Sequence, residues 1–313
     1  MSFKVIDPGF MSSIQDLGRM GYQHLGITTG GPLDEYSFAW ANRLLGNTAN
    51  SAVLEVTYGG LKLEVQADTC IALTGADLGA TLNKTYIEPW CSYAVRAGDR
   101  LDFAQPAIGL RAYLSVIDGF QTPLTLGSRA TVLREQVGGL DGRGAKFVAG
   151  DRLPFLPSSE SRLERTPKED IPDYSKPLDL GVIAGYQYEL FPASERRRFF
   201  SHPYQVTQNI DRMGYRLFGP AIESNQRGII SEGISLGAIQ IPADGQPIVL
   251  MRDRQTIGGY PKLGNLSGLD VGLLAQRGPG AEVRFYPQDL ASAQAQRQIF
   301  LRHLKRFTLS HPN

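Results

Sequence analysis

Short runs of alternating apolar and polar residues recur along the whole chain. Examples are residues 61–65 (LKLEV), 111–116 (RAYLSV) and 238–241 (AIQI). A period of two is typical of strands that bury one face, and glycine and proline favour the turns between them. The sequence holds 35 glycines and 19 prolines, enough to end many such runs. The pattern predicts a mainly β protein built from barrels or sandwiches, with a few helices.

Two segments depart from this pattern and predict helices. In the first, Asp34 is a plausible N-cap and Gly46 a plausible end. Phe38, Ala41, Asn42 and Leu45 would fall on one face of this helix. In the second, Asp289 would cap a terminal helix with an apolar stripe of Leu290, Ile299, Phe300, Leu304 and Phe307. Its basic residues Arg297, Arg302, Lys305 and Arg306 lie toward the C-terminal end, where the helix dipole favours cations.

The length predicts two domains, because 313 residues exceed what one hydrophobic core usually serves. Residues 157–177 (PSSESRLERTPKEDIPDYSKP) combine four prolines with dense mixed charge, which is typical of a linker. We therefore predict an N-terminal β-barrel domain over 1–157, a linker over 158–177, and a C-terminal β-barrel domain with a terminal helix over 178–313.

The two halves share several features in the same order. Residues 19–26 (RMGYQHLG) and 212–219 (RMGYRLFG) agree at five of eight positions. Glu55 and Glu232 each stand 16 residues before an apolar run that starts at residue 71 or 248. A glycine turn followed by an alternating strand occurs at 97–103, 149–155 and 279–285. Together these parallels predict two related β domains.

Charge and composition exclude several classes of protein. A formal net charge of +1 argues against general binding of nucleic acids, which needs a concentrated basic face. No apolar run approaches the roughly 20 residues that span a bilayer, and no signal sequence is evident, so we expect a cytoplasmic protein. Cys70 and Cys91 could form a disulfide, but free buried thiols are the preferred interpretation. None of the four histidines has metal-ligand spacing to a second His or Cys, so no metal site is expected.

The densest combination of charge and glycine lies in residues 251–264 (MRDRQTIGGYPKLG), which follow an apolar strand. A strand that opens into a glycine turn can present backbone N–H groups to an anion, and Arg254 and Lys262 add positive charge. The alternative is a surface hairpin with solvated charges. Residue types alone do not decide between the two.

Other charged residues have the same double interpretation. Arg19 and Arg212 each lie close to an aspartate, which indicates either a structural ion pair or a guanidinium that binds a carboxylate or phosphate. Glu55 and Glu232 precede strands, and they could act as general bases or only bind backbone groups at a barrel end.

Several of these stretches carry a family signature. The chain resembles the allophanate-hydrolase-subunit-2 family, also described as biotin-dependent-carboxyltransferase-like, from about residue 3 to about residue 287. The motifs are 15–22 (QDLGRMGY), 72–77 (ALTGAD), 109–114 (GLRAYL), 126–131 (LGSRAT), 211–217 (DRMGYRL) and 245–262 (GQPIVLMRDRQTIGGYPK). Arg252 and Ile257 depart from the residues that usually stand there. The resemblance implies tandem cyclophilin-like β-barrels.

The family includes carboxyltransferase regions of urea carboxylases, Kip-antagonist proteins and stand-alone components of 5-oxoprolinases. This chain has no Met-Lys-Met motif of a biotin carrier, so no biotin is expected on it. Its size is similar to that of the 5-oxoprolinase components, which implies ATP with Mg²⁺ at the level of a complex. The implied partners are an allophanate-hydrolase-subunit-1-type protein (the B component of 5-oxoprolinase) and a lactam-utilisation-type protein (its A component). A carboxyltransferase working with a biotinylated partner and a non-catalytic Kip-type regulator remain as alternatives.

The 5-oxoprolinase interpretation predicts the roles of individual residues. Opening a lactam requires an electrophilic carbonyl, and cations would stabilise the charge on phosphate and on the developing oxyanion. The predicted catalytic residues are Lys262, Arg254, Arg212 and Asp253. The predicted substrate-binding residues are Gln255, Tyr260, Gly258, Gly259, Arg19, Glu55 and Glu232.

Overall fold

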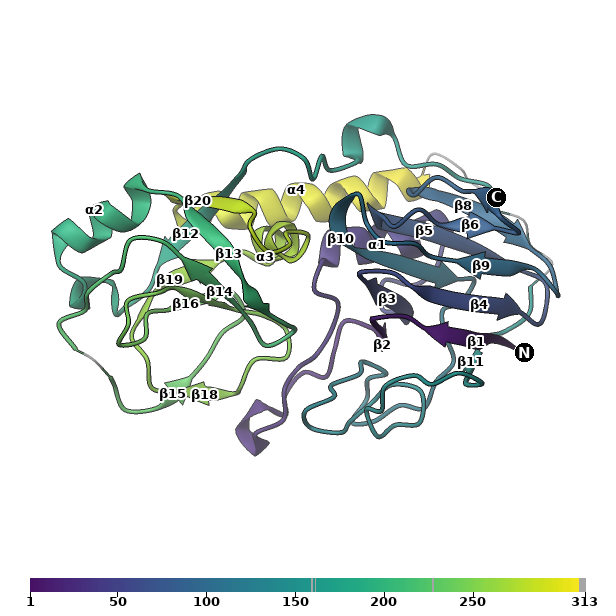
Figure 1. Cartoon of the computed structure of the whole chain (residues 1–313), viewed down its shortest axis with the longest axis horizontal. Coiled ribbons are helices and arrows are strands. Elements are labelled where there is room, and N and C mark those ends of the chain that lie inside the picture. The colour runs from purple at the N-terminus through teal and green to yellow at the C-terminus, as the bar shows by residue number, and fades with distance from the viewer. Residues whose placement is uncertain (159, 161, 227, 310–313) are drawn as a thin grey trace. The chain divides into compact units, whose positions relative to one another are not determined.

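The computed structural model describes residues 1–158, 160, 162–226 and 228–309, with only the helical backbone for 306–309. Its contacts divide the chain into two compact units. The first unit contains residues 1–19, 30–175 and the described residues from 304 on; the second contains 20–29 and 176–303. Both are built mainly from strands, which confirms the predicted fold class (Figure 1).

The strands of the first unit form two antiparallel sheets. The six-stranded sheet contains, in spatial order, β11 (Arg152–Pro154), β1 (Ser2–Pro8), β4 (Leu61–Val65), β9 (Arg100–Asp102), β6 (Thr81–Leu82) and β7 (Thr85–Tyr86). The five-stranded sheet contains β2 (Met11–Gln15), β3 (Val53–Thr57), β10 (Ile108–Val116), β5 (Thr69–Asp77) and β8 (Cys91–Val95). Buried side chains from both sheets form one apolar core.

Helix α1 (Glu35–Leu44) explains why β5 is buried along nearly its whole length. One face of the five-stranded sheet lies on the shared core, while α1 packs on the other through Phe38 and Ala41. The predicted cap is confirmed, because the Asp34 carboxylate accepts a hydrogen bond from the Ser37 N–H at 3.1 Å. Gly46, which follows the helix, has a φ of 67°, a conformation that glycine adopts without strain.

The second unit is a closed barrel accompanied by helices. Its strands, in spatial order, are β12 (Leu178–Ala184), β19 (Lys262–Leu266), β16 (Ala238–Gln240), β17 (Ile248–Leu250), β14 (Gly214–Phe218), β13 (Tyr204–Ile210) and β20 (Glu282–Pro287). A two-stranded sheet of β15 (Glu232–Gly233) and β18 (Ile257–Gly258) extends from it. The helices are α2 (Ala193–Ser201), α3 (Gly268–Ala275) and α4 (Leu290–Leu309). Single 3₁₀ turns cover Gln23–Leu25, Lys168–Asp170 and Tyr188–Leu190.

The proposed repeats agree with the structure only in part. Gly98, Gly150 and Gly280 all have positive φ and precede strands, so the three similar sequence endings are similar in structure. In contrast, residues 214–218 form β14, whereas 20–26 hold a single 3₁₀ turn and no strand. The matched residues in these two stretches therefore do not adopt one common structure.

The predicted apolar stripe on the terminal helix needs correction. Phe300 is buried, but Leu290 and Ile299 are 57% and 66% exposed. The buried line passes instead through Ala293 and Phe300, seven residues apart and therefore on one helical face. The side chains of Arg306 and Phe307 lie outside the described part of the structure.

Much of the segment expected to be a linker packs on the first unit. The Ser92 hydroxyl donates to the carbonyl of Arg162, and the Thr166 N–H donates to that of Trp90. The division between the units falls between Ser175 and Lys176. The domain limits themselves stay a prediction.

Candidate functional site

The charged turn after β17 is buried, although three of its four residues are ionic. Met251, Arg252, Asp253 and Arg254 are all shielded from solvent. Backbone hydrogen bonds fix this turn to the loop before β14: Met251 N–H donates to Met213 at 2.9 Å, and Asp253 N–H donates to Arg212 at 2.7 Å. The structure therefore does not support a surface hairpin with solvated charges at these four positions.

Arg212 and Asp253 form a buried bidentate ion pair. The Nε atom of Arg212 donates to one carboxylate oxygen of Asp253 at 2.8 Å, and its Nη2 donates to the other at 2.9 Å. Two parallel charge-assisted hydrogen bonds fix both groups in position. The backbone N–H of Asp253 also donates to the carbonyl of Arg212, so main-chain and side-chain contacts both hold the turn after β17.

Arg254 is a buried cation whose hydrogen bonds go to carbonyl groups. Its Nε donates to Ile234 at 3.1 Å and its Nη1 to Met251 at 3.4 Å. Burial and the neighbouring charge of Arg252 lower the pKa of Arg254 to about 10, against the opposing effect of Asp253. The guanidinium remains protonated at neutral pH. It can therefore attract an anion in surroundings of low dielectric constant.

Lys262 is held by a network at the start of β19. Its ammonium forms an ion pair with Glu232, while its backbone N–H donates to Gln187 Oε1 at 2.7 Å. Gln187 Nε2 in turn donates to Glu232 at 2.7 Å. Desolvation raises the pKa of Glu232, but hydrogen bonds from Lys262, Tyr186 and Gln187 outweigh it and hold that pKa below its ordinary value.

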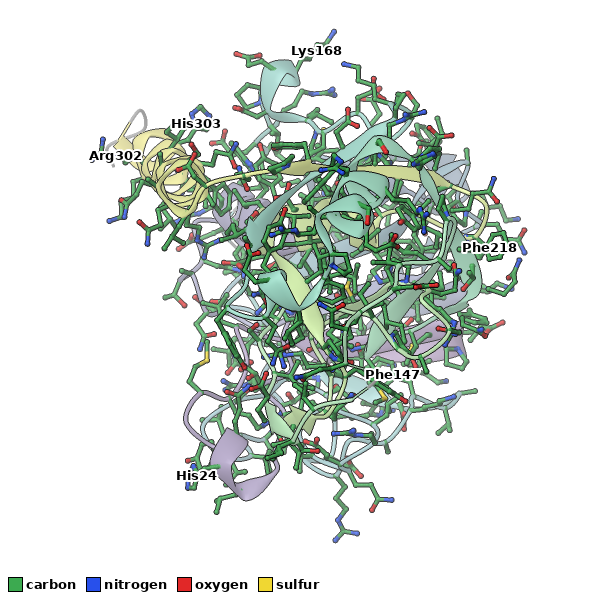
Figure 2. The ribbon with its side chains drawn as sticks, turned by 90° about the vertical axis from the view of Figure 1, so that its left-hand side faces the viewer. His24, Phe147, Lys168, Phe218, Arg302 and His303 are labelled. Atoms are coloured by element: carbon green, nitrogen blue, oxygen red, sulfur yellow. The ribbon has the colours of Figure 1, made fainter. Side chains whose placement is uncertain are left out.

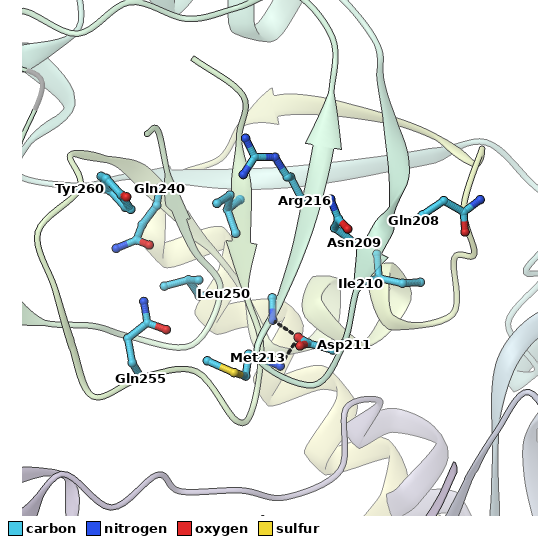
Figure 3. Close-up of a pocket in the computed structure, with 12 residues that line it drawn as sticks. Gln208, Asn209, Ile210, Asp211, Met213, Arg216, Gln240, Leu250, Gln255 and Tyr260 are labelled. Carbon is cyan, nitrogen blue, oxygen red and sulfur yellow. Dashed lines mark hydrogen bonds between the residues drawn. The ribbon is translucent and has the colours of Figure 1, made fainter. Parts of the chain in front are cut away.

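A pocket of about 580 Å³ lies on the face of the barrel (Figure 3). Strands β13, β14, β16 and β17 form its floor, and the turn between β17 and β19 contributes Gln255 and Tyr260. It is lined by Gln208, Asn209, Ile210, Asp211, Met213, Gly214, Arg216, Gln240, Ile248, Leu250, Gln255 and Tyr260. The pocket thus mixes amides and a guanidinium with an aliphatic wall, which suits a small polar ligand that has an apolar part.

The two predicted glycines shape the β15–β18 extension. Gly258 pairs with Glu232 across the short sheet, and the carbonyl of Gly259 accepts from the Ile229 N–H at 2.8 Å. The second unit therefore holds Lys262 with Glu232 and Arg212 with Asp253, and it places Gln255 and Tyr260 in the pocket.

Arg19 and Glu55 lie in the interior of the first unit. Arg19 donates to the carbonyl of Ala130, and the Glu55 carboxylate accepts from the Leu33 N–H and the Tyr113 hydroxyl, both at 2.8 Å. Each side chain is 1% exposed. Their contacts are those of residues that hold loops in place within the first unit.

The sequence did not single out Gln187 and Gln240. Gln187 links the two ends of the Lys262–Glu232 pair, and Gln240 lies at the pocket floor. Gln240 stands in an alternating run, where a polar residue normally indicates a solvent-facing position. Its neighbour in the run, Ile239, is in the core as expected.

The histidines and cysteines that the structure describes do not gather into a metal-binding cluster. His24 and His303 lie well apart on the surface (Figure 2), while His311 is outside the described residues. Cys70 and Cys91 are buried and are not joined in a disulfide. Within the described residues, no three His, Cys, Asp or Glu side chains gather as a metal site would require. No described helix is both long and apolar enough to cross a membrane.

Comparison with known proteins establishes the family. The family described as carboxyltransferase domain, subdomain A and B, matches residues 25–287. The chain belongs to this family. It is 36% identical over 296 residues to the C subunit of 5-oxoprolinase from Escherichia coli K12, with 94% of each protein covered. It is 34% identical over 310 residues to the same protein of Haemophilus influenzae, with 96% of this chain and 97% of that protein covered.

A solved structure of another protein matches this chain in both fold and sequence. The crystal structure of Kluyveromyces lactis urea carboxylase matches with a TM-score of 0.91 and 31% identity. The match covers 98% of this chain but 29% of that chain. The chain is therefore homologous both to the C subunit of 5-oxoprolinase and to carboxyltransferase domains of urea carboxylases.

The buried ion pair generates a stability prediction. We expect Asp253→Asn to lower the free energy of unfolding by about 3 kcal/mol, because it removes the carboxylate that neutralises buried Arg212. The matched control is Asp102→Asn, which breaks a pair whose side chains are 51% and 30% exposed and should cost less than about 1 kcal/mol. Urea denaturation of both variants measures this difference. Equal losses would contradict a structural role for the buried pair.

The Lys262 network generates a prediction about pH. Because the folded-state pKa of Glu232 lies below its unfolded value, the network stabilises the fold above the unfolded pKa and loses this effect as the pH falls through the folded pKa. Lys262→Met should raise the Glu232 pKa, measured by ¹³C NMR titration of its carboxyl group. Gln187→Met removes a neutral donor to Glu232 and leaves the charge of Lys262 in place, so it should raise the Glu232 pKa less. An unchanged pKa in the Lys262 variant would contradict the network.

Proposed function

We propose that the chain acts as the C subunit of an ATP-dependent 5-oxoprolinase complex that converts 5-oxo-L-proline to L-glutamate. The observation that carries this proposal is the end-to-end match with the Escherichia coli protein, since 94% of each protein is covered. The match with urea carboxylase covers only 29% of the urea carboxylase chain. The match thus extends over nearly the whole of the 5-oxoprolinase subunit but over one region of the urea carboxylase.

The chemistry of lactam opening gives the charged residues a role. ATP transfers its γ-phosphoryl group to the amide oxygen and ADP leaves, which makes the ring carbon electrophilic. A first water attacks this carbon, the C–N bond breaks with the nitrogen taking a proton, and an acyl phosphate forms. A second water then releases phosphate and leaves the side-chain carboxylate of glutamate. These steps place negative charge on the phosphoryl group and on the oxyanion, which fixed cations stabilise. Arg254 and Lys262 are the proposed cations, while Arg212 and Asp253 hold the turn that presents Arg254.

The proposal places the protein in the cytoplasm with two partners, a B component of the allophanate-hydrolase-subunit-1 type and an A component of the lactam-utilisation type. ATP with Mg²⁺ would be used at the level of the complex, without biotin attached to this chain. The second candidate is the carboxyltransferase part of a urea-carboxylase-like enzyme. The TM-score of 0.91 over 98% of this chain favours it.

Reconstitution separates the two candidates. The chain purified alone should release no measurable glutamate from 5-oxoproline and ATP, whereas the mixture with the A and B components should do so. The control is a mixture with a biotin carboxylase and a biotinylated carrier, assayed for ATP-dependent carboxylation of urea. Full 5-oxoprolinase turnover by the isolated chain would contradict the need for partners, and urea carboxylation without glutamate release would favour the carboxyltransferase.

Replacing Lys262 tests its proposed role in the active complex. Lys262→Met keeps the aliphatic stem and removes the charge, so we expect kcat/KM to fall on the order of 10²-fold, about 2.7 kcal/mol of transition-state stabilisation. Lys62→Met is the matched control, because Lys62 lies on the first unit with its side chain 42% exposed. Partner binding should remain normal in both variants, and both should stay folded at the assay temperature, although loss of the Lys262–Glu232 pair lowers the melting temperature of the Lys262 variant. Activity of the Lys262 variant within about threefold of wild type would exclude this role.

A further inference from the structure

Gln240 presents a buried amide with an unused donor at the floor of the barrel-face pocket. Its side chain is 1% exposed, and no described residue accepts a hydrogen bond from its Nε2. Buried polar groups are almost always paired, because leaving one unpaired costs free energy. A ligand in the pocket would supply the missing partner.

The backbone around Gln240 directs this amide. A β-bulge separates the pairing of Ile239 with Gly264 from that of Gln240 with Lys262. Bulges re-aim side chains and recur beside active sites. In the pocket, the carboxamide ends of Gln240 and Gln255 turn toward each other beside Leu250 (Figure 3).

Gly258 provides the space that the amide occupies. A Cβ atom at this position would lie 3.0 Å from Gln240 Nε2 and 2.5 Å from Cδ1 of Ile234. Gly258 is not among the glycines with positive φ, so its backbone conformation is open to other residues. Glycine is thus needed at residue 258 for space and not for backbone conformation, because a side chain there would crowd the Gln240 amide.

We propose that Gln240 recognises a small cyclic amide through two antiparallel hydrogen bonds. Its Nε2 donates to the lactam carbonyl, and the lactam N–H donates to its Oε1. A carboxamide carries a donor and an acceptor side by side. A five-membered lactam matches this edge because its ring holds the amide cis, whereas an ordinary trans peptide points its N–H and C=O in opposite directions.

The walls of the pocket favour a lactam over urea, which presents a similar hydrogen-bonding edge. Ile248 pairs with Gln240 across the sheet, and Leu250 stands on the same face. These side chains offer apolar contact to ring methylene groups, which urea lacks. The assignment of Gln240 as a specificity-determining residue rests on the proposed function, because 5-oxoproline is such a lactam.

Binding to the full chain tests this without catalysis. The probes are 2-pyrrolidinone, N-methyl-2-pyrrolidinone and urea, titrated while the glutamine side-chain amides are followed by ¹H–¹⁵N NMR. Wild type should bind 2-pyrrolidinone at least about tenfold more tightly than its N-methyl analogue. Gln240→Met should lose this discrimination. If that variant folds poorly, Gln240→Glu replaces it in the test; it keeps the shape of the side chain without the donor and should bind the two pyrrolidinones with a smaller ratio of affinities. Gly258→Ala should weaken binding by displacing the amide.

A matched control is Gln205→Met, since Gln205 is exposed on β13 and does not line the pocket; it should retain the wild-type ratio of affinities. A ratio near one in wild type, an unchanged ratio in Gln240→Met, or urea binding without 2-pyrrolidinone binding would each overturn the inference. If the role of Gln240 were purely structural, Gln240→Met would alter the stability of the protein and leave the ratio of the two pyrrolidinone affinities unchanged.

The reconstituted complex separates this inference from the proposed function. If the wild-type complex releases no glutamate, the proposed function fails while the probe titration still decides the binding site. If the wild-type complex is active and Gln240→Met keeps the KM for 5-oxoproline within about twofold, the binding site fails while the proposed function stands. An increase in KM of about tenfold or more with Gln240→Met supports both.

Discussion

The bidentate pair between Arg212 and Asp253 is the interaction on which the candidate site depends. A buried guanidinium without a carboxylate is strongly unfavourable, so this pair allows two ionic side chains to lie inside the barrel end. It also shares a backbone hydrogen bond with the turn after β17. Since Arg254 follows Asp253 directly, its position is fixed by the same contacts.

The two proposed cations of the second unit differ in how their charge is balanced. Lys262 is in contact with the Glu232 carboxylate, so an incoming anion must compete with that group. Arg254 donates to the carbonyl groups of Ile234 and Met251, and burial lowers its pKa. Because carbonyl dipoles compensate a cation less than a carboxylate does, Arg254 is the better site for an arriving phosphate or carboxylate, and Lys262 is better suited to charge that develops later in the reaction.

The sequence predicted the fold class and the first helix because both depend on local patterns. Alternation of apolar residues identifies strands, and Asp34 caps its helix through a hydrogen bond only three residues along the chain. The partners in the site could not be read in this way. Lys262 and Glu232 are 30 residues apart and come together beside two-residue strands too short to show a period. Gln240 was missed because alternation alone does not reveal that another segment covers an outward-facing position.

Similar sequence stretches in the two halves of the chain have different physical roles. In the first unit, Asp16 accepts hydrogen bonds from the Ser128 hydroxyl and the Arg129 N–H, and Arg19 donates to the Ala130 carbonyl. Those charges are used to hold one loop. In the second unit, the corresponding Arg212 pairs with Asp253, and the turn so held carries Arg254 and then Gln255, which lines the pocket. The arginine of this pattern thus holds a loop at Arg19 and supports the candidate site at Arg212, which is why we propose that the chemistry belongs to the second unit.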